Sequence, residues 1–145
     1  KDSLFIQWRS ALLSQFGKRL YEAVKRARKS CIVSWAPSIY PWSKEEYLQD
    51  WPTWLKEGYA DLVIPQLYRY NLPAYEKILT QLKTQVADSL QAKIVPGILT
   101  SIGDGYQADK DLLQHMIELN RKNGFKGEVF FYFETLNRID FKFYQ

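Results

Sequence analysis

The sequence contains few of the residues that build disulfides, metal sites and nucleophilic triads. Its 145 residues include one cysteine, Cys31, and one histidine, His115. One cysteine allows no internal disulfide, and one histidine argues against both a zinc site and a Ser-His-Asp triad. Cys31 opens an apolar run in which a small buried thiol would fit, and His115 falls mid-helix, where we expect a surface or interhelical residue. We therefore expect no metal and no cofactor.

Long apolar runs and a leading methionine are missing as well. No stretch of 18 apolar residues occurs, so the sequence predicts no membrane-spanning helix. The sequence begins at Lys1 and its only methionine is Met116. We therefore expect the natural start, with any targeting segment, to lie before this sequence.

The composition is that of an ordinary globular domain. Hydrophobic residues make up 46% and charged residues 25% of the chain, and no low-complexity tract interrupts it, which excludes a disordered protein. The length predicts a single domain over residues 1–145. The aromatic share, 16%, is high, and aromatic side chains both fill cores and provide stacking surfaces for sugars or bases.

The net charge of +4 is partly concentrated near the end of a predicted helix, in Lys25, Arg26, Arg28 and Lys29. Cations at a helix C-terminus complement the helix dipole, which favours a solvated helix end and predicts no nucleic-acid partner. A phosphate-binding or nucleic-acid-binding module that uses this basic patch is the alternative.

Apolar residues at steps of four predict one long amphipathic helix over residues 4–29. The stripe, with two residues that widen it, consists of Trp8, Leu12, Phe16, Leu20, Val24, Leu13 and Ala27. Further helices are predicted from Ser43, which has capping-box spacing to Glu46, over 51–57 after an Asp50 N-cap, after Asn71, and over 109–123.

Strands are predicted over 31–37, 61–69, 92–99 and 128–134. They begin about every 30 to 35 residues, which is the length of a βα repeat. The sequence therefore predicts an α/β fold of four parallel βα units. These units form either the C-terminal half of a (β/α)8 TIM barrel or a small flavodoxin-like open sheet. The leading helix favours a fragment that covers strands five to eight of a larger barrel.

A half barrel would leave apolar strand edges unpaired at 31–36 and 129–133. Unpaired apolar strands are templates for association, so we expect them to be covered. A missing upstream half-barrel, a second copy of the chain that pairs at the open edges, or the first helix folding back could each cover them.

The strand over 61–69 is the centre of the predicted site. Its continuous apolar residues indicate a strand buried on both faces, and Gln66, Tyr68 and Arg69 follow at its carboxyl end, where α/β folds place ligands. Pro65 removes a ladder donor, and we interpret it as a bulge that aims Gln66 and Tyr68.

Other candidate residues follow the remaining strands. Trp35, Tyr40 and Trp42 come after the first strand, although Trp35 could equally be a core tryptophan with its N–H satisfied. Glu134 follows the last strand and is the only carboxylate expected at the mouth of the site. Glycoside hydrolysis needs two carboxylates about 5 to 10 Å apart, so we expect this chain to lack a complete pair.

Three segments resemble a known family. They are 48–58 (LQDWPTWLKEG), 61–69 (DLVIPQLYR) and 120–134 (NRKNGFKGEVFFYFE). Ser34-Trp35-Ala36-Pro37 fits a strand ending of the same family, and Trp8-Arg9 fits its start after the fourth strand. Together they are similar to the C-terminal half of the glycosyl-hydrolase-like family 10 barrel, a bacterial family formerly of unknown function that includes glycosidases of peptide-free peptidoglycan.

The resemblance implies a TIM barrel from the cell envelope, periplasmic or extracellular, that acts on a glycan. The family's paired aspartates, at the end of strand four, would lie before this sequence. Trp35, Gln66, Tyr68 and Glu134 match positions expected to line the sugar cleft. The leading hypothesis is that this piece contributes substrate-binding groups and one carboxylate. A non-catalytic carbohydrate-binding module is a further alternative.

Overall fold

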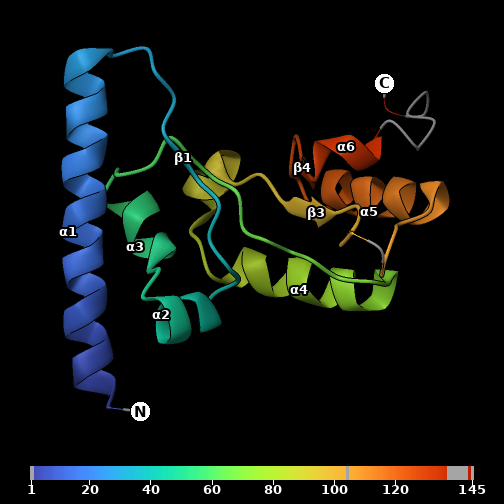
Figure 1. The fold of residues 1–145 in the computed structure, drawn as a ribbon, viewed down its shortest axis with the longest axis horizontal. Helices are drawn as coiled ribbons and strands as arrows, with labels where there is room; N and C mark the ends of the chain where they lie inside the picture. Colours follow the sequence, from blue (N-terminus) through green and yellow to red (C-terminus); the bar gives the residue numbers. More distant parts are fainter. Residues whose placement is uncertain (1, 104, 137–143, 145) are drawn as a thin grey trace.

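The computed structural model describes residues 2–103, 105–136 and 144, and shows a mixed α/β chain with parallel strands. A long helix stands at one end, the strands lie in the middle, and two adjacent helices lie at the other end (Figure 1). The elements are α1 (Ser3–Ala27), β1 (Ser34–Trp35), α2 (Trp42–Tyr47), α3 (Trp51–Lys56), β2 (Leu62–Val63), α4 (Leu72–Thr84), the 3-10 helix η1 (Asp88–Lys93), β3 (Gly97–Leu99), α5 (Lys110–Lys122), β4 (Val129–Phe131) and α6 (Phe133–Leu136).

The strands pair in chain order. β1 pairs with β2 and β3 pairs with β4, both in parallel. Parallel bridges from Val63 to Ile94 and from Gln66 to Gly97 join the two pairs. All four carboxyl ends therefore point the same way, so the segments that follow the strands meet at one edge.

The two faces of the strands differ sharply in burial. Trp35, Val63 and Ile98 turn toward the helices, and Val63 and Ile98 are fully buried there. On the other face Ser34 is exposed, and Val129 and Phe131 keep 41% and 46% of their surface exposed. Because side chains alternate along a strand, one face meets the helix layer, and the other is open along β4 but closed at Leu99, which pairs with Phe131 and is buried.

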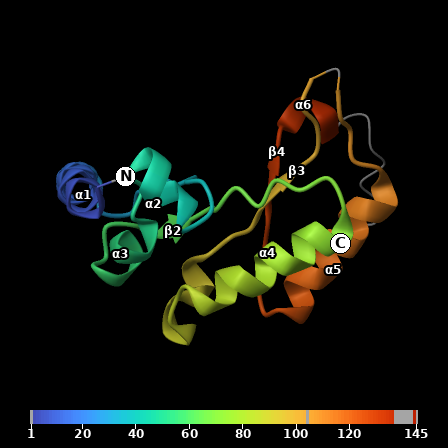
Figure 2. The same cartoon turned by 90° about the horizontal axis from the view of Figure 1, so that it is seen from below.

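The helices α4 and α5 lie side by side and supply much of the core (Figure 2). Their starts follow the sequence prediction, because Asn71 accepts a hydrogen bond from the Ala74 N–H and Asp109 accepts one from the Leu112 N–H. Each helix places apolar residues on one side, and these join Trp51, Leu67 and Ile98 in one cluster. No helix in the described part of the chain is long and apolar enough to cross a membrane.

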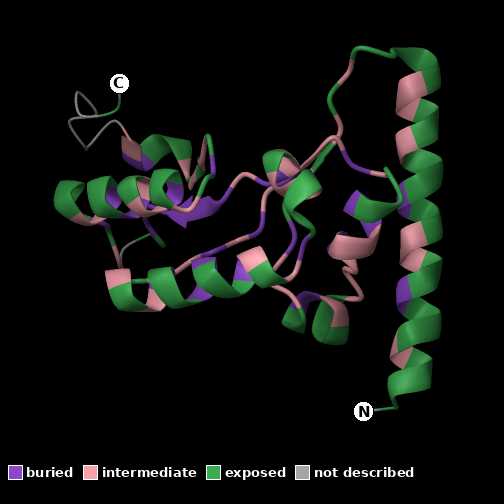
Figure 3. Ribbon diagram, turned by 180° about the vertical axis from the view of Figure 1, so that it is seen from behind, coloured by how far each residue is buried: buried purple, intermediate pink, exposed green. Residues whose placement is uncertain are grey.

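The apolar stripe of α1 faces solvent, contrary to the usual arrangement of an amphipathic helix. Trp8 is 58% and Phe16 52% exposed, and most of this helix is coloured as exposed in Figure 3. The opposite, small-residue face packs against α2 and α3, with Ser10 and Gly17 buried. The prediction of the helix is confirmed, but the stripe does not face this chain's own core.

Several local predictions were wrong. Residues 92–93 belong to η1, and the last strand ends at Phe131, so Glu134 lies on α6. Ser43 does not form a capping box, because its hydroxyl donates to the Gln49 carbonyl at 2.9 Å. Asp50 does occupy the N-cap position of α3, as predicted, but its side chain makes no cap bond and instead pairs with Lys44 at 2.8 Å. Cys31 is only half-buried and lies outside β1.

Pro65 is not a bulge. The bridges on either side of it step three residues on both strands, from Val63 to Gln66 and from Ile94 to Gly97, so neither strand carries an extra residue. The Gly97 N–H donates to the Pro65 carbonyl at 2.9 Å, which keeps the register through the proline. Pro65 removes one backbone N–H donor from the strand. Side chains still alternate after it, so Gln66 and Tyr68 lie on the same side.

Candidate functional site

A hollow of about 310 Å³ lies at the carboxyl ends of β1 and β2. Four residues predicted from the sequence to bind substrate line it, together with two residues of the loop after β1. The lining residues are Ser38, Ile39, Trp42, Gln66, Tyr68 and Arg69. The volume falls at the lower end of the range for small-molecule sites, and its mixture of ring faces and polar groups is typical of them.

Gln66 and Tyr68 reach this hollow because they are two residues apart on the same strand extension. The Gln66 side-chain N–H donates to the Ala36 carbonyl at 2.9 Å, which ties the end of β2 to the chain that leaves β1. The Tyr68 ring stacks on Phe131 with centroids 5.4 Å apart and an interplanar angle of 29°. Burial raises the pKa of the Tyr68 hydroxyl above its ordinary value, so at neutral pH this group is protonated and can donate a hydrogen bond.

Arg69 and Trp42 complete the lining. Arg69 donates from Nη1 to the Tyr68 carbonyl at 2.7 Å, which holds the guanidinium beside the strand end. Trp42 opens α2, stacks edge-on against Tyr47 at 4.9 Å and keeps 46% of its surface exposed. An exposed indole beside amide, hydroxyl and guanidinium donors suits a sugar, which offers both an apolar ring face and many hydroxyl groups.

The structure places Trp35 away from this hollow. Its indole N–H donates to the Tyr59 carbonyl at 3.0 Å, and its ring lies 5.4 Å from Trp54. A Cβ on Gly17 would meet the Trp35 ring at 3.8 Å, so this side chain fills the space between β1 and α1. The arrangement corresponds to the alternative expected from the sequence, a packed tryptophan with its N–H satisfied.

Tyr40 also lies elsewhere. It stacks edge-on against Trp51 at 6.1 Å and its carbonyl accepts a bond from Gln85 at 2.7 Å. It lines a separate hollow of about 490 Å³ between α1 and α2, with Ser3 and Lys44 among its neighbours. Tyr40 is therefore not brought together with Gln66 and Tyr68.

Glu134 is exposed on α6, three residues after Phe131, and does not line the hollow. Below it, the Thr100 hydroxyl contacts the Thr135 hydroxyl and donates to the Phe131 carbonyl at 2.7 Å, which fixes the start of α6 to the end of β3. Among the described residues no carboxylate lines the hollow, so the geometry provides binding groups rather than an acid pair.

Sequence reasoning missed Ser38, Ile39 and Phe131 as members of this site. Ser38 and Ile39 follow a strand end, which was a usable signal, but their small or apolar side chains did not suggest a ligand. Phe131 was assigned to the last strand but not to the site, whereas the structure stacks its ring on Tyr68 and leaves 46% of its surface exposed. The described residues contain no cluster of three or more histidine, cysteine or acidic side chains suited to a metal, and His115 lies exposed with Nδ1 2.7 Å from the Asp111 carbonyl.

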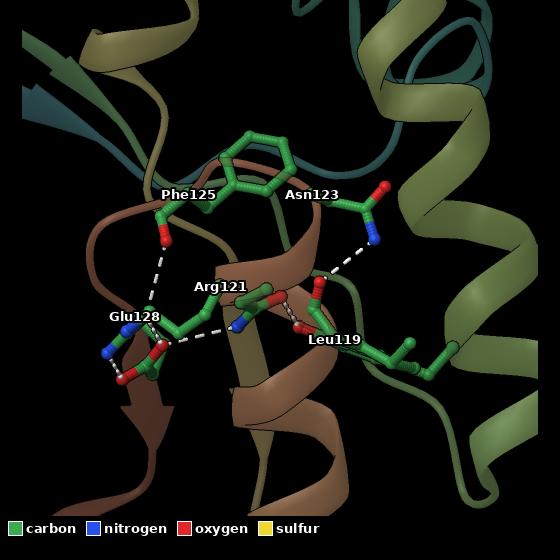
Figure 4. Close-up of polar contacts among 7 residues, drawn as sticks. Leu119, Arg121, Asn123, Phe125 and Glu128 are labelled. Carbon is green, nitrogen blue, oxygen red and sulfur yellow. Dashed lines mark hydrogen bonds and ion pairs between the residues drawn. The ribbon is translucent and has the colours of Figure 1, made fainter.

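A second polar cluster lies at the opposite end of the strands and is structural. Glu128 has a fully buried side chain and receives two bonds from Arg121, at 2.8 and 2.9 Å (Figure 4). Asn120 also donates to Glu128 at 3.3 Å and accepts the Tyr75 hydroxyl at 2.8 Å. Because the cluster precedes β4, it anchors α5 to the strand start and is distant from the ligand edge.

The shape of the chain is similar to part of a solved enzyme domain, the PgaB (BpsB) glycoside hydrolase domain from Bordetella bronchiseptica. The TM-score is 0.71 at 17% sequence identity, and the match covers 93% of this chain and 40% of that one. The likeness therefore shows a shared fold, and this chain spans less than half of the domain's length.

Sequence comparison addresses the family directly. No curated protein matches the chain. The model of the Glycosyl hydrolase-like 10 family matches residues 1–104. These residues include β2, the loop after β1 and every residue that lines the hollow. This match covers most of the chain and confirms the resemblance to the family; the segments 48–58 and 61–69 lie inside it and the segment 120–134 lies outside. The chain belongs to the Glycosyl hydrolase-like 10 family.

Proposed function

We propose that this chain supplies the saccharide-binding groups of a bacterial glycoside hydrolase that acts on cell-envelope glycan of the peptidoglycan type. The observation that carries the proposal is the hollow at the carboxyl ends of β1 and β2, where Trp42, Gln66, Tyr68 and Arg69 meet. The family supports a glycan-related role. Activity in the cell envelope, in the periplasm or outside the cell, belongs to the same proposal.

The proposal includes the larger fold: a fragment that forms strands five to eight of a (β/α)8 barrel. Strand pairing in chain order supports it, because a flavodoxin-like doubly wound sheet reverses its strand order. The exposed Val129 and Phe131 also support it, since the interior of a closed barrel is filled with side chains. In a complete barrel Glu134 would face acids contributed by other strands, and these would carry the main catalytic role.

Saccharide binding by the 145-residue chain tests this proposal. The probe is a peptide-free peptidoglycan tetrasaccharide, titrated by calorimetry, and we expect saturable binding. Replacing Gln66 by Ala or Tyr68 by Phe removes one hydrogen-bonding group, so the affinity should fall about three- to tenfold. Release of new reducing ends, measured in parallel, should be absent because the hollow contains no acid pair.

The matched control is Gln114→Ala, which removes an exposed amide on α5 that donates to Glu118 at 3.1 Å. It should bind as the original chain does, and it and Tyr68→Phe should melt within about 2 °C of that chain, whereas Gln66→Ala, which also loses the bond to Ala36, should melt a few degrees lower. Absence of saturable binding, or an equal loss in Gln114→Ala, would contradict the proposal. Cleavage by the chain alone would mean that it contains a carboxylate pair after all. Binding without cleavage even in a longer protein would favour a carbohydrate-binding module.

A further inference from the structure

Arg69 lies where two hollows meet. The first is the hollow described above, and the second, of about 300 Å³, runs along α4. Both are lined by Ile39 and Arg69. The second is completed by Ala74, Lys77, Ile78 and Gln81. Because the two hollows share Ile39 and Arg69, we call them together the path past the Arg69 guanidinium.

The charge of this path is of one sign. Its linings include Arg69 and Lys77 and contain no aspartate or glutamate. Within residues 2–103, 105–136 and 144, no carboxylate forms an ion pair with Arg69, whereas Arg121 and Lys44 each have one. The single bond from Arg69 Nη1 to the Tyr68 carbonyl fixes the guanidinium and leaves its other donors for a ligand.

The geometry points to a saccharide that carries a carboxylate, with Arg69 as the residue that selects it. This inference rests on the proposed function. A guanidinium presents a planar fork that matches the two oxygens of a carboxylate, and such charge-assisted bonds are stronger than bonds to neutral groups. A neutral sugar would bind through Trp42 and the Gln66 amide but would leave the fork unmatched. A positively charged amino sugar would be repelled by the like charges of Arg69 and Lys77.

The layout assigns separate tasks to separate residues. The exposed face of Trp42 offers stacking to a sugar ring, while Arg69, at the junction, reaches an acidic substituent on that ring or the next one. Affinity for the sugar backbone and preference for its charge should therefore be separable by mutation. Arg69 is a specificity-determining residue, and its loss should remove the preference rather than all binding.

Three probes with similar backbones test this. The first is the peptide-free peptidoglycan tetrasaccharide with free lactyl carboxylates, the second is its methyl ester, and the third is neutral chitotetraose. Calorimetric titration of the 145-residue chain should show about 10- to 100-fold tighter binding of the free acid than of either neutral probe, the range expected for bonds to a charged group. In Arg69→Gln the three affinities should agree within about twofold.

The matched control is Arg19→Gln, which removes an exposed arginine of α1 and should keep the preference. Equal binding of acid and ester by the original chain would overturn this inference while leaving the proposed function in place, and no binding of any probe would overturn both. A preference that survives Arg69→Gln and disappears in Lys77→Gln would overturn the assignment to Arg69. If Arg69→Gln fails to fold, Arg69→Lys takes its place. We expect this variant to fold and to show a reduced preference for the free acid. An undiminished preference would overturn the role of the planar guanidinium.

Discussion

At the scale of single residues, Gln66 has two roles that are joined in one amide. Its N–H group donates to the Ala36 carbonyl and so connects two strand ends, while the hollow borders the same side chain. The carbonyl end of the amide is thereby held in a fixed position instead of rotating freely. A ligand that bonds to it loses less conformational entropy than it would with a mobile glutamine.

Asp61 shows a different use of polar groups, at the start of β2. Its carboxylate accepts bonds from Val33 N–H at 2.7 Å and Tyr21 hydroxyl at 3.0 Å, and pairs with Lys25 at 2.6 Å. Burial alone would raise the pKa of this carboxyl, but the bonds from Lys25, Val33 and Tyr21 outweigh burial and hold the pKa below its ordinary value. Lys25, one of the basic residues near the end of α1, is therefore engaged in structure, which supports the helix-end interpretation.

We predict that Asp61→Asn lowers stability at neutral pH by about 1 kcal/mol, because the amide accepts weaker bonds than the carboxylate. A group whose pKa is depressed by folding stabilises the protein above its unfolded pKa, near 4, and loses this contribution as pH falls through the lower folded value. The difference between the two proteins should therefore shrink below about pH 4. Melting temperatures measured from pH 3 to 7 check this.

Glu76→Gln is the control for this experiment, since Glu76 is an exposed residue in the interior of α4. Its melting curve should stay close to that of the original chain across the same range. A gap between Asp61→Asn and the original chain that is constant from pH 3 to 7 would rule out the linkage described here.

At the scale of elements, the close approach of β2 and β3 depends on a glycine. A Cβ at Gly97 would lie 2.9 Å from the Pro65 carbonyl oxygen, and backbone cannot move aside as a flexible side chain can. We predict that Gly97→Ala destabilises the chain by about 1–3 kcal/mol, the usual range for overpacking. Chemical denaturation should show a lower midpoint with an unchanged slope.

Gly127→Ala provides the comparison. A Cβ there would meet only a Val95 methyl group at 4.0 Å, which is ordinary contact. This variant should fall within about 0.5 kcal/mol of the original chain. Equal effects of the two substitutions would mean that the Gly97 site relaxes without cost.

The helices and the site strand were predictable because their signals are local. Asn71 and Asp109 sit at helix starts as expected, and Gln66 and Tyr68 follow an apolar run whose carboxyl end faces the hollow. The strand lengths were not predictable, because strands in a parallel sheet are defined by distant partners. Glu134 was assigned to a strand for the same reason: the run of apolar residues continues past Phe131, but the pairing with β3 stops there.

The direction in which α1 faces could not be read from its sequence either. Its stripe predicted a helix, and periodicity alone does not say what covers the stripe. The structure shows that Ser10, Ser14 and Gly17 make the contact with α3 and β1 instead, with the Trp54 N–H donating to Ser14 at 2.8 Å. Small residues allow this close approach, so it is they, and not the apolar stripe, that indicate which side of α1 packs against the rest of the chain.

At the scale of the whole molecule, two apolar surfaces remain exposed. One is the stripe of α1, where Trp8, Leu12, Phe16 and Leu20 are exposed beside Leu4 and Phe5, and the other is the open face at Val129 and Phe131. With about 150–250 Å² per aromatic side chain, the half-exposed aromatics of α1 alone leave about 300 Å² of apolar surface. In the larger barrel that we propose, further βα units or a second copy would cover a surface of this kind.

The last prediction concerns this surface. The 145-residue chain, studied alone, should self-associate with increasing concentration, because burying the stripe removes apolar area from water. Trp8→Glu combined with Phe16→Glu should weaken association at least about tenfold, since each carboxylate would have to be desolvated at the contact. Gln7→Glu combined with Ala11→Glu adds the same charge to exposed positions of α1 outside the stripe and should have little effect. Sedimentation velocity measures the association of all three proteins. The stripe is not an association surface if the original chain stays monomeric up to high concentration, or if the two double variants have equal effects.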